Sequence, residues 1–218
     1  DRFKRWLDEQ NAYVFTINGF PHGNFHGQRV KEDVYRPDWT DPERLSYTLR
    51  LFTILSSLLP QGVEGSVSTL PASFKEFHPM GRLPDLAFDH LLEIAKEIEK
   101  LSLGNGQDLH LGLEPEPLGW FETIPETIEF FKQLLDRAED PEMVRRRIGV
   151  NYDCCHLAIE YEDAQEGLDA LKNAGIRLSK LHLSSALSVR PTVENLHTLK
   201  NYTEEVYLHQ VIIAQDRK

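Results

Sequence analysis

The sequence predicts an α/β fold, and more specifically a (β/α)8 barrel of the TIM type that is incomplete in this chain. Two observations support this prediction. Strand patterns and helix patterns alternate about five times along the 218 residues, which requires right-handed crossovers between parallel strands. In addition, every expected strand has small or polar residues at alternate positions. Strands covered by helices on both faces would be apolar throughout, whereas barrel strands meet helices on one face only.

The five expected strands span residues 13–18, 65–70, 109–114, 148–153 and 178–184. Their small or polar residues are Thr16 and Asn18, Ser66 and Ser68, Gly112 and Glu114, Asn151 and Asp153, and His182 and Ser184. A complete barrel of this type takes about 250 residues. We therefore expect a single barrel domain over residues 1–218 that contains about strands 3 to 7, with the first two strands and the eighth absent.

Helix signals lie between these strands. Asp41 before Pro42 is a helix start, and Thr123 with Glu126 forms a capping box. Asp163 caps a further helix. The expected helices cover residues 1–10, 42–59, 85–103, 124–135, 164–174 and a segment after Pro191. Residues 140–147 are expected to be a charged connector, residues 71–84 a long loop, and residues 207–213 a final strand or β-arm.

Composition excludes several classes of protein. With 24 Lys and Arg against 35 Asp and Glu, the formal charge is −11, which argues against a nucleic-acid partner. No run approaches the roughly 18 apolar residues of a membrane span, and the first residues lack the apolar core of a signal peptide. The two cysteines, Cys154 and Cys155, are adjacent and read as reduced thiols. A cytoplasmic protein is expected, and the oligomeric state is open.

Potential metal ligands recur at the ends of three successive strands. Glu114 ends the third strand, Asp153 ends the fourth and is followed by His156, and His182 lies in the fifth. Such a mixed set of carboxylates and imidazoles suits Mn²⁺, Co²⁺, Zn²⁺ or Fe²⁺, with Mg²⁺ also open. The alternative is that these polar side chains are hydrogen-bonded to one another at the open end of the barrel and bind no metal. Lys180 would then supply the positive charge that buried carboxylates need.

The pattern of Glu, then Asp-x-x-His, then His resembles the xylose-isomerase-like TIM barrels, which include sugar isomerases, sugar-phosphate epimerases and endonuclease-IV-type phosphodiesterases. Longer stretches resemble the EboE-like metabolite traffic proteins of bacteria. These stretches are residues 15–23, 25–27, 65–71, 111–117 and 183–187.

The resemblance implies roles for individual residues. Glu114, Asp153 and His182 match metal positions, and His156 matches a position that contacts substrate or a second metal. Glu114 is also the expected acid or base, with His156 as a second catalytic candidate. The carboxylate that usually comes from the eighth strand is expected to lie outside this chain, so one metal ligand is missing from the expected set.

The sequence thus favours a divalent-metal-dependent isomerase or epimerase of a small hydroxylated or phosphorylated metabolite. His22, His26 and Lys180 are the expected substrate-binding residues, together with the loop from Lys75 to Arg82. Two other functions stay open, a metal-dependent phosphoesterase and a non-catalytic protein that binds or carries a metabolite.

Overall fold

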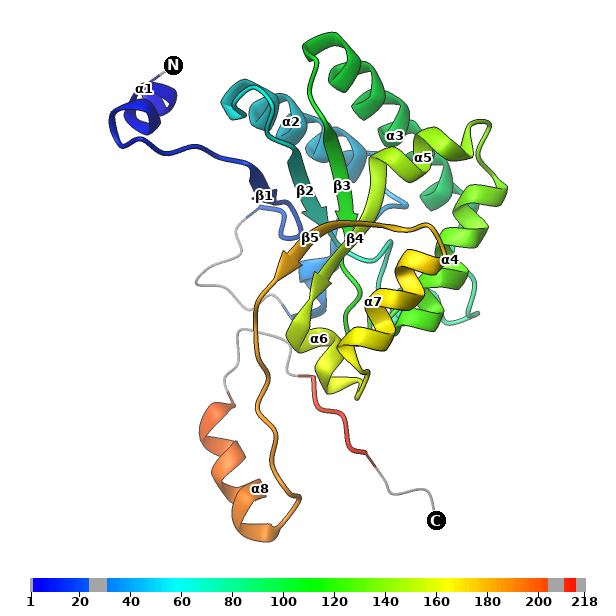
Figure 1. Cartoon of the computed structure of the whole chain (residues 1–218). Helices are drawn as coiled ribbons and strands as arrows, with labels where there is room; N and C mark the ends of the chain where they lie inside the picture. The colour runs from blue at the N-terminus through cyan, green and yellow to red at the C-terminus, as the bar shows by residue number, and fades with distance from the viewer. Residues whose placement is uncertain (1, 24–30, 204–209, 215–218) are drawn as a thin grey trace.

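Five parallel strands form one sheet in the order β1-β2-β3-β4-β5, which curls into half of a barrel with helices on its outer face (Figure 1). The computed structural model describes residues 2–23, 31–203 and 210–214. The strands are β1 (Thr16–Asn18), β2 (Gly65–Thr69), β3 (Leu109–Leu113), β4 (Ile148–Asp153) and β5 (Arg177–His182). The predicted α/β class and the parallel, partly closed sheet are confirmed.

The expected helices alternate with the strands, and two helices beyond the expected set are present at residues 141–147 and 154–159. The α-helices are α1 (Arg2–Glu9), α2 (Pro42–Leu58), α3 (Asp85–Asn105), α4 (Ile124–Asp136), α5 (Pro141–Arg147), α6 (Cys154–Ile159), α7 (Ala164–Asn173) and α8 (Val193–Leu199). Three short 3-10 helices are η1 (Lys31–Tyr35), η2 (Lys75–Phe77) and η3 (Lys200–Tyr202).

Helix starts follow the capping chemistry of the sequence. The side chain of Asp41 accepts a hydrogen bond from the backbone of Glu43, and Thr123 and Glu126 form the reciprocal capping box of α4. The prediction of a connector at residues 140–147 was wrong. Asp140 caps α5 and Pro141 occupies its first turn, so this segment is helical for the same reason as α2.

The inner face of the sheet is lined with small residues that let the strands approach closely. A Cβ atom on Gly149 would lie 2.2 Å from the carbonyl oxygen of Arg177, and one on Gly112 would lie 3.1 Å from Asn151. Residue pairing between β4 and β5 also shifts after Val150, because β5 contains a bulge. The Ser179 hydroxyl therefore turns inward and donates to the carbonyl of Leu111, 3.2 Å away.

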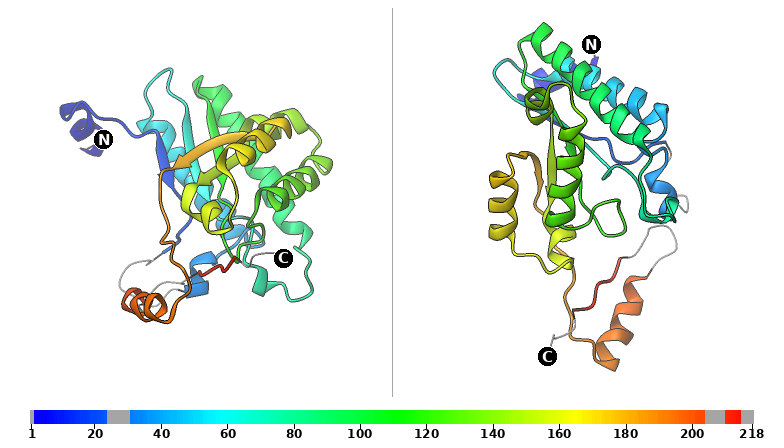
Figure 2. Two further views of the ribbon diagram at one scale, coloured as in Figure 1. Left: turned by 60° about the horizontal axis from the view of Figure 1, so that its bottom comes forward. Right: turned by 90° about the vertical axis from the view of Figure 1, so that its right-hand side faces the viewer.

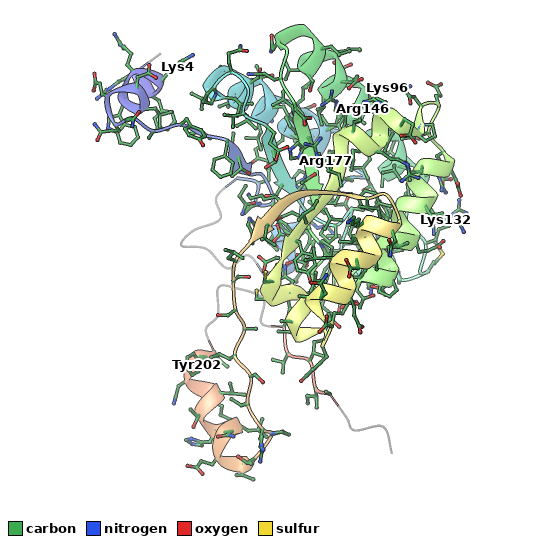
Figure 3. The ribbon with its side chains drawn as sticks, in the orientation of Figure 1. Lys4, Lys96, Lys132, Arg146, Arg177 and Tyr202 are labelled. Atoms are coloured by element: carbon green, nitrogen blue, oxygen red, sulfur yellow. The ribbon has the colours of Figure 1, made fainter. Side chains whose placement is uncertain are left out.

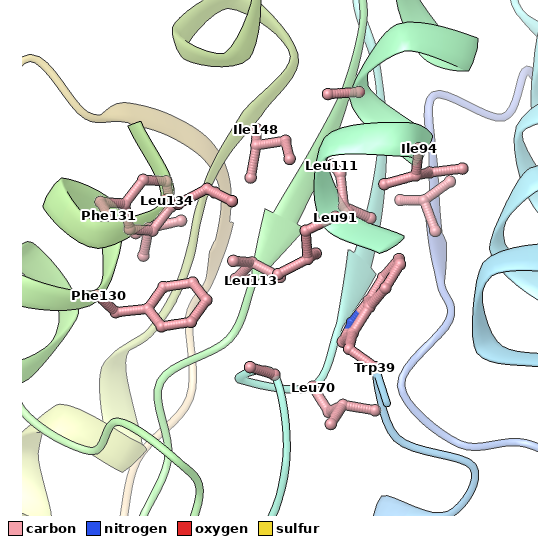
Figure 4. Packing of buried hydrophobic residues seen from close by; sticks show 14 of the residues in the cluster. Trp39, Leu70, Leu91, Ile94, Leu111, Leu113, Phe130, Phe131, Leu134 and Ile148 are labelled. Carbon is pink, nitrogen blue, oxygen red and sulfur yellow. The ribbon is translucent and has the colours of Figure 1, made fainter. Parts of the chain in front are cut away.

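The hydrophobic core lies between the outer face of the sheet and the helices (Figure 4). Leu111 and Leu113 of β3 are fully buried against α3, which contributes Leu91 and Ile94. Because side chains alternate along a strand, the residues between them face the barrel interior instead. The core thus fixes which side chains can reach a site inside the barrel.

Ion pairs close the end of the sheet where the strands begin, where Figure 3 labels Arg177. The Arg177 guanidinium lies 2.7 Å from Asp108 and 2.9 Å from Glu64. His110 on the inner face nearby is 1% exposed, and neither ring nitrogen has a hydrogen-bond partner. Burial, aided by the charge of Arg177, lowers the pKa of His110 to about 3. His110 is therefore neutral at physiological pH.

After β5 the chain leaves the sheet. Helix α8 stands apart from the sheet and from the helices that cover it (Figures 1 and 2), and Figure 3 labels Tyr202 near this helix. The chain then returns, and the side chain of Gln210 donates to the carbonyl of Pro117, 2.7 Å away. The expected final strand at residues 207–213 lies partly outside the described residues, and residues 210–213 are in no strand. Among the described helices, none combines the length and the apolarity needed to traverse a bilayer.

Candidate functional site

Three of the predicted ligands meet where neighbouring strands end. Glu114 directly follows β3, Asp153 is the last residue of β4, and His182 is the last residue of β5. The ends coincide because the strands are parallel and in register, with Asp153 paired to His182. The backbone N–H of Glu114 donates to Thr69 across the sheet, 2.9 Å away, which holds Glu114 at the same level.

The three side chains offer ligand atoms that all lie within 4.8 Å of one another. His182 Nδ1 is 3.1 Å from Asp153 Oδ2 and 3.5 Å from Glu114 Oε1. Both carboxylates are buried, with exposed fractions of 5% and 7%, while His182 is partly accessible. His182 is therefore the most solvent-accessible of the three side chains.

The site concentrates negative charge that a cation would balance. The hydrogen bond with Glu114 raises the pKa of His182, and the charge of Glu114 and a hydrogen bond with Asp153 add to the effect against burial. The two neighbouring carboxylates thus favour the protonated, positively charged form of His182. A divalent ion supplies the same charge with more ligand bonds, and two carboxylate oxygens with one imidazole nitrogen suit such an ion. The residues present therefore fit a divalent metal.

Two polar residues that the sequence analysis did not select position this set. The Asn151 amide donates to Glu114 Oε2 over 2.6 Å and lies 3.3 Å from His182 Nδ1. The Ser184 hydroxyl donates to Asp153, which also accepts from the backbone of Cys155, 3.0 Å away. Asn151 shares the inward parity of Asp153, and this signal could have identified it.

Hydrogen bonding keeps Asp153 ionised. Burial is the largest influence and by itself raises the pKa of Asp153, but the hydrogen bond from Ser184, the charge of His156 and the bonds from Cys155 outweigh it. The net effect is a pKa below the usual range for an aspartate. A deprotonated carboxylate is the form that binds metal ions.

His156 also lies at the cluster, on a helix that the sequence analysis did not anticipate. Helix α6 starts directly after β4, with Asp153 as its N-cap. The His156 ring lies between two carboxyl groups, with Nδ1 3.6 Å from Glu114 Oε1 and Nε2 3.9 Å from Glu116 Oε2. Asp153, Cys155 and His156 form a second group of potential ligand atoms within 4.8 Å of one another.

Lys180 projects into the interior from β5 and reaches across to β2. Its ammonium group donates to the Ser68 hydroxyl, 3.2 Å away, and Ser68 in turn lies 3.4 Å from Asn18 Oδ1. Burial lowers the pKa of Lys180, against the attraction of Glu114. Polar groups from three strands are thus joined by contacts in the interior of the half-barrel.

Among the described residues, the other predicted substrate-binding side chains contact groups outside this cluster. His22 lies 3.6 Å from Glu43 and lines a separate pocket of about 380 Å³. His26 lies outside the described residues. In the loop from Lys75 to Arg82, Lys75 pairs with Glu122 and Glu126, His78 contacts Ser73, and Arg82 pairs with Asp85.

Comparisons with known proteins show the fold. No protein-family model matches the chain, and no curated protein sequence matches it. Among solved structures, the 3-keto-D-glucoside 4-epimerase YcjR from E. coli in its apo form is similar, with a TM-score of 0.51 and 18% sequence identity over 98% of this chain and 77% of that one. The chain therefore has the fold of this sugar epimerase.

Two more distant structures align less well. The probable 3-DHS dehydratase AsbF of petrobactin synthesis from Bacillus anthracis has a TM-score of 0.41 and 16% identity, over 79% of this chain and 51% of that one. The structure of SacUVDE also has a TM-score of 0.41, with 14% identity over 95% of this chain and 62% of that one.

Proposed function

We propose that this chain binds one divalent transition-metal ion through Glu114, Asp153 and His182 and handles a small hydroxylated or phosphorylated metabolite, in the manner of a sugar isomerase or epimerase. The observation that carries the proposal is the convergence of two buried carboxylates and one imidazole at the ends of three neighbouring strands. The likeness in fold to a 3-keto-D-glucoside 4-epimerase supports the reaction class. The finer proposal is a protein of the EboE-like metabolite traffic type.

The chain's own residues divide the work of such a reaction. A bound divalent ion would polarise a carbonyl or enediolate oxygen of the substrate. His156 and Glu114, 3.6 Å apart, are placed to move a proton at the neighbouring carbon. Lys180, whose ammonium group reaches across the interior to Ser68, is placed to hold a substrate oxygen. Asn151 fixes the Glu114 carboxylate.

Metal content tests the first part of the proposal. The chain is purified without chelator, offered Mn²⁺, Co²⁺ and Zn²⁺, and analysed by mass spectrometry beside the double variant Glu114→Gln/Asp153→Asn. A control variant, Glu142→Gln/Asp169→Asn, removes the same charge from exposed positions. We expect about one ion per chain in the parent and the control and a large loss in the site variant. A folded parent that takes up no ion contradicts the proposal.

Turnover tests the second part. The loaded protein is incubated with keto sugars and sugar phosphates, and exchange of substrate hydrogen with deuterium from the solvent is followed by NMR. Exchange that depends on His156 supports isomerisation or epimerisation. Stoichiometric binding without exchange selects the non-catalytic binding protein instead. Phosphate release selects the phosphoesterase.

A further inference from the structure

The chain returns to the open end of the half-barrel after the outlying α8. Residues 210–214, in red in Figure 1, lie near α6 at the end of the sheet to which the strand arrows point. Gln210 and Ile212 are partly buried, whereas Val211 and Ile213 are 74% and 66% exposed. Alternation with a period of two is the pattern of an extended segment that lies with one face on a protein surface. This segment therefore packs against the body of the molecule.

Two hydrogen bonds anchor the segment to different loops at this end of the sheet. The Gln210 amide donates to the carbonyl of Pro117, 2.7 Å away, in the loop that follows β3. The Tyr161 hydroxyl, in the turn that follows α6, donates to the carbonyl of Ile212, 3.4 Å away. Because α6 begins directly after β4, the segment bridges the connections that leave β3 and β4. These two strands supply both carboxylates of the cluster.

Backbone strain is present at both anchor points. Tyr161 has a φ of +60°, and Leu118, which follows Pro117, has a φ of +70°. Such values are outliers for bulky side chains, and they persist only where the surrounding structure enforces them, often at ligand clamps and switch regions. The hydroxyl of the buried Tyr35 also lies 3.4 Å from the Pro117 carbonyl. Contacts from residues 210 and 212 thus add to those that hold the two loops in this shape.

We propose that residues 210–214 are a strap that closes the open end of the half-barrel beside the loops after β3 and β4, and that Gln210 is the residue that latches it. The strap shields the carboxylates of Glu114 and Asp153 from water, and a metabolite enters past β5, where His182 is the most accessible side chain of the cluster. Closing segments of this kind govern entry and release in many enzymes. The shielding of a bound ion rests on the proposed function, but the latch does not.

Hydrogen–deuterium exchange, followed by mass spectrometry on the full chain without added metal, tests the latch. The backbone N–H groups of residues 118–120 and 161–162 all donate hydrogen bonds in the closed loops. Gln210→Ala removes the first anchor, and we expect exchange at residues 118–120 to become about 2- to 10-fold faster, the effect of losing one hydrogen bond. Tyr161→Phe removes the second anchor and should have the same effect at residues 161–162.

Two matched variants are the controls. Gln61→Ala changes an exposed glutamine, and Tyr202→Phe removes the hydroxyl of a tyrosine that is 61% exposed, as Tyr161 is. Exchange at both loops should equal that of the parent in these controls. Unchanged exchange at both loops in Gln210→Ala and in Tyr161→Phe overturns the inference.

The rate at which EDTA removes Zn²⁺ from the loaded chain tests the shielding. We expect removal to be about 2- to 10-fold faster in Gln210→Ala than in the parent and in Gln61→Ala, because the strap spends more time open. Equal rates of removal in the three proteins contradict the shielding of the cluster by the strap. A parent that binds no zinc overturns the proposed function instead, and amide exchange still decides whether Gln210 latches the strap.

Discussion

Replacing Gly149 by alanine is expected to lower the free energy of unfolding by about 3 kcal/mol, at the upper end of the usual range for overpacking. The new Cβ would lie 2.2 Å from the carbonyl oxygen of Arg177 and 2.6 Å from the hydroxyl of Ser179. The hydroxyl can rotate away, but the carbonyl belongs to the backbone of β5. Relief therefore requires β5 to move away from β4.

Urea denaturation followed by circular dichroism measures this effect. With a slope of about 2 kcal/mol per molar, the midpoint should fall by about 1.5 M. The matched control is Gly104→Ala in α3, where an added Cβ meets no atom within 4 Å. The control should gain up to about 1 kcal/mol from helix propensity. Because β5 carries His182, Gly149→Ala should also weaken Zn²⁺ binding. Equal midpoints in the two variants would refute the reasoning about close approach.

Three further predictions concern stability. His110 is neutral when buried, and its pKa is lowered to about 3 from an ordinary value of 6.5, so the unfolded chain binds the extra proton between these values. The stability that His110 contributes is therefore present above pH 6.5 and is lost as pH falls through this window, by about 2 kcal/mol between pH 7 and pH 5. The urea midpoint of His110→Phe should fall less over this pH range than the midpoint of the parent. An equal fall of the two midpoints would contradict the assignment. Thr123→Ala removes the capping box of α4 and should cost about 1 kcal/mol, whereas Thr192→Ala, which uncaps the outlying α8, should leave the main thermal transition in place. Ala72 has a φ of +65°, so Ala72→Gly should leave the free energy of unfolding unchanged or raise it by up to about 1 kcal/mol. The control Ala95→Gly, inside α3, should lower the free energy of unfolding. The opposite order would show that the turn at residue 72 is unstrained.

Much of the fold followed from local patterns because those patterns report burial directly. Alternating side chains located the five strands, and the capping residues located most helix starts. Helix α5 was missed although Asp140, Pro141 and Glu142 repeat the start signal of α2. Its length of seven residues left too little apolar periodicity to register.

The meeting of the strand-end side chains was predictable from the sequence, whereas the positions of side chains in loops were not. Glu114, Asp153 and His182 lie together because parallel strands in register bring their ends to one edge. His22 occupies a separate pocket, since the path of a loop is decided by tertiary contacts that the sequence pattern does not encode.

The bulge in β5 has a consequence for how this strand can change in evolution. Val150 pairs with Leu178 and Asn151 with Lys180, so Ser179 is an extra residue that the ladder absorbs. Loss of Ser179 alone would restore regular pairing and leave Lys180 and His182 facing inward. Loss of a residue between Lys180 and His182 would turn His182 to the outer face. A one-residue change in length is thus tolerable on one side of Lys180 and destroys the site on the other.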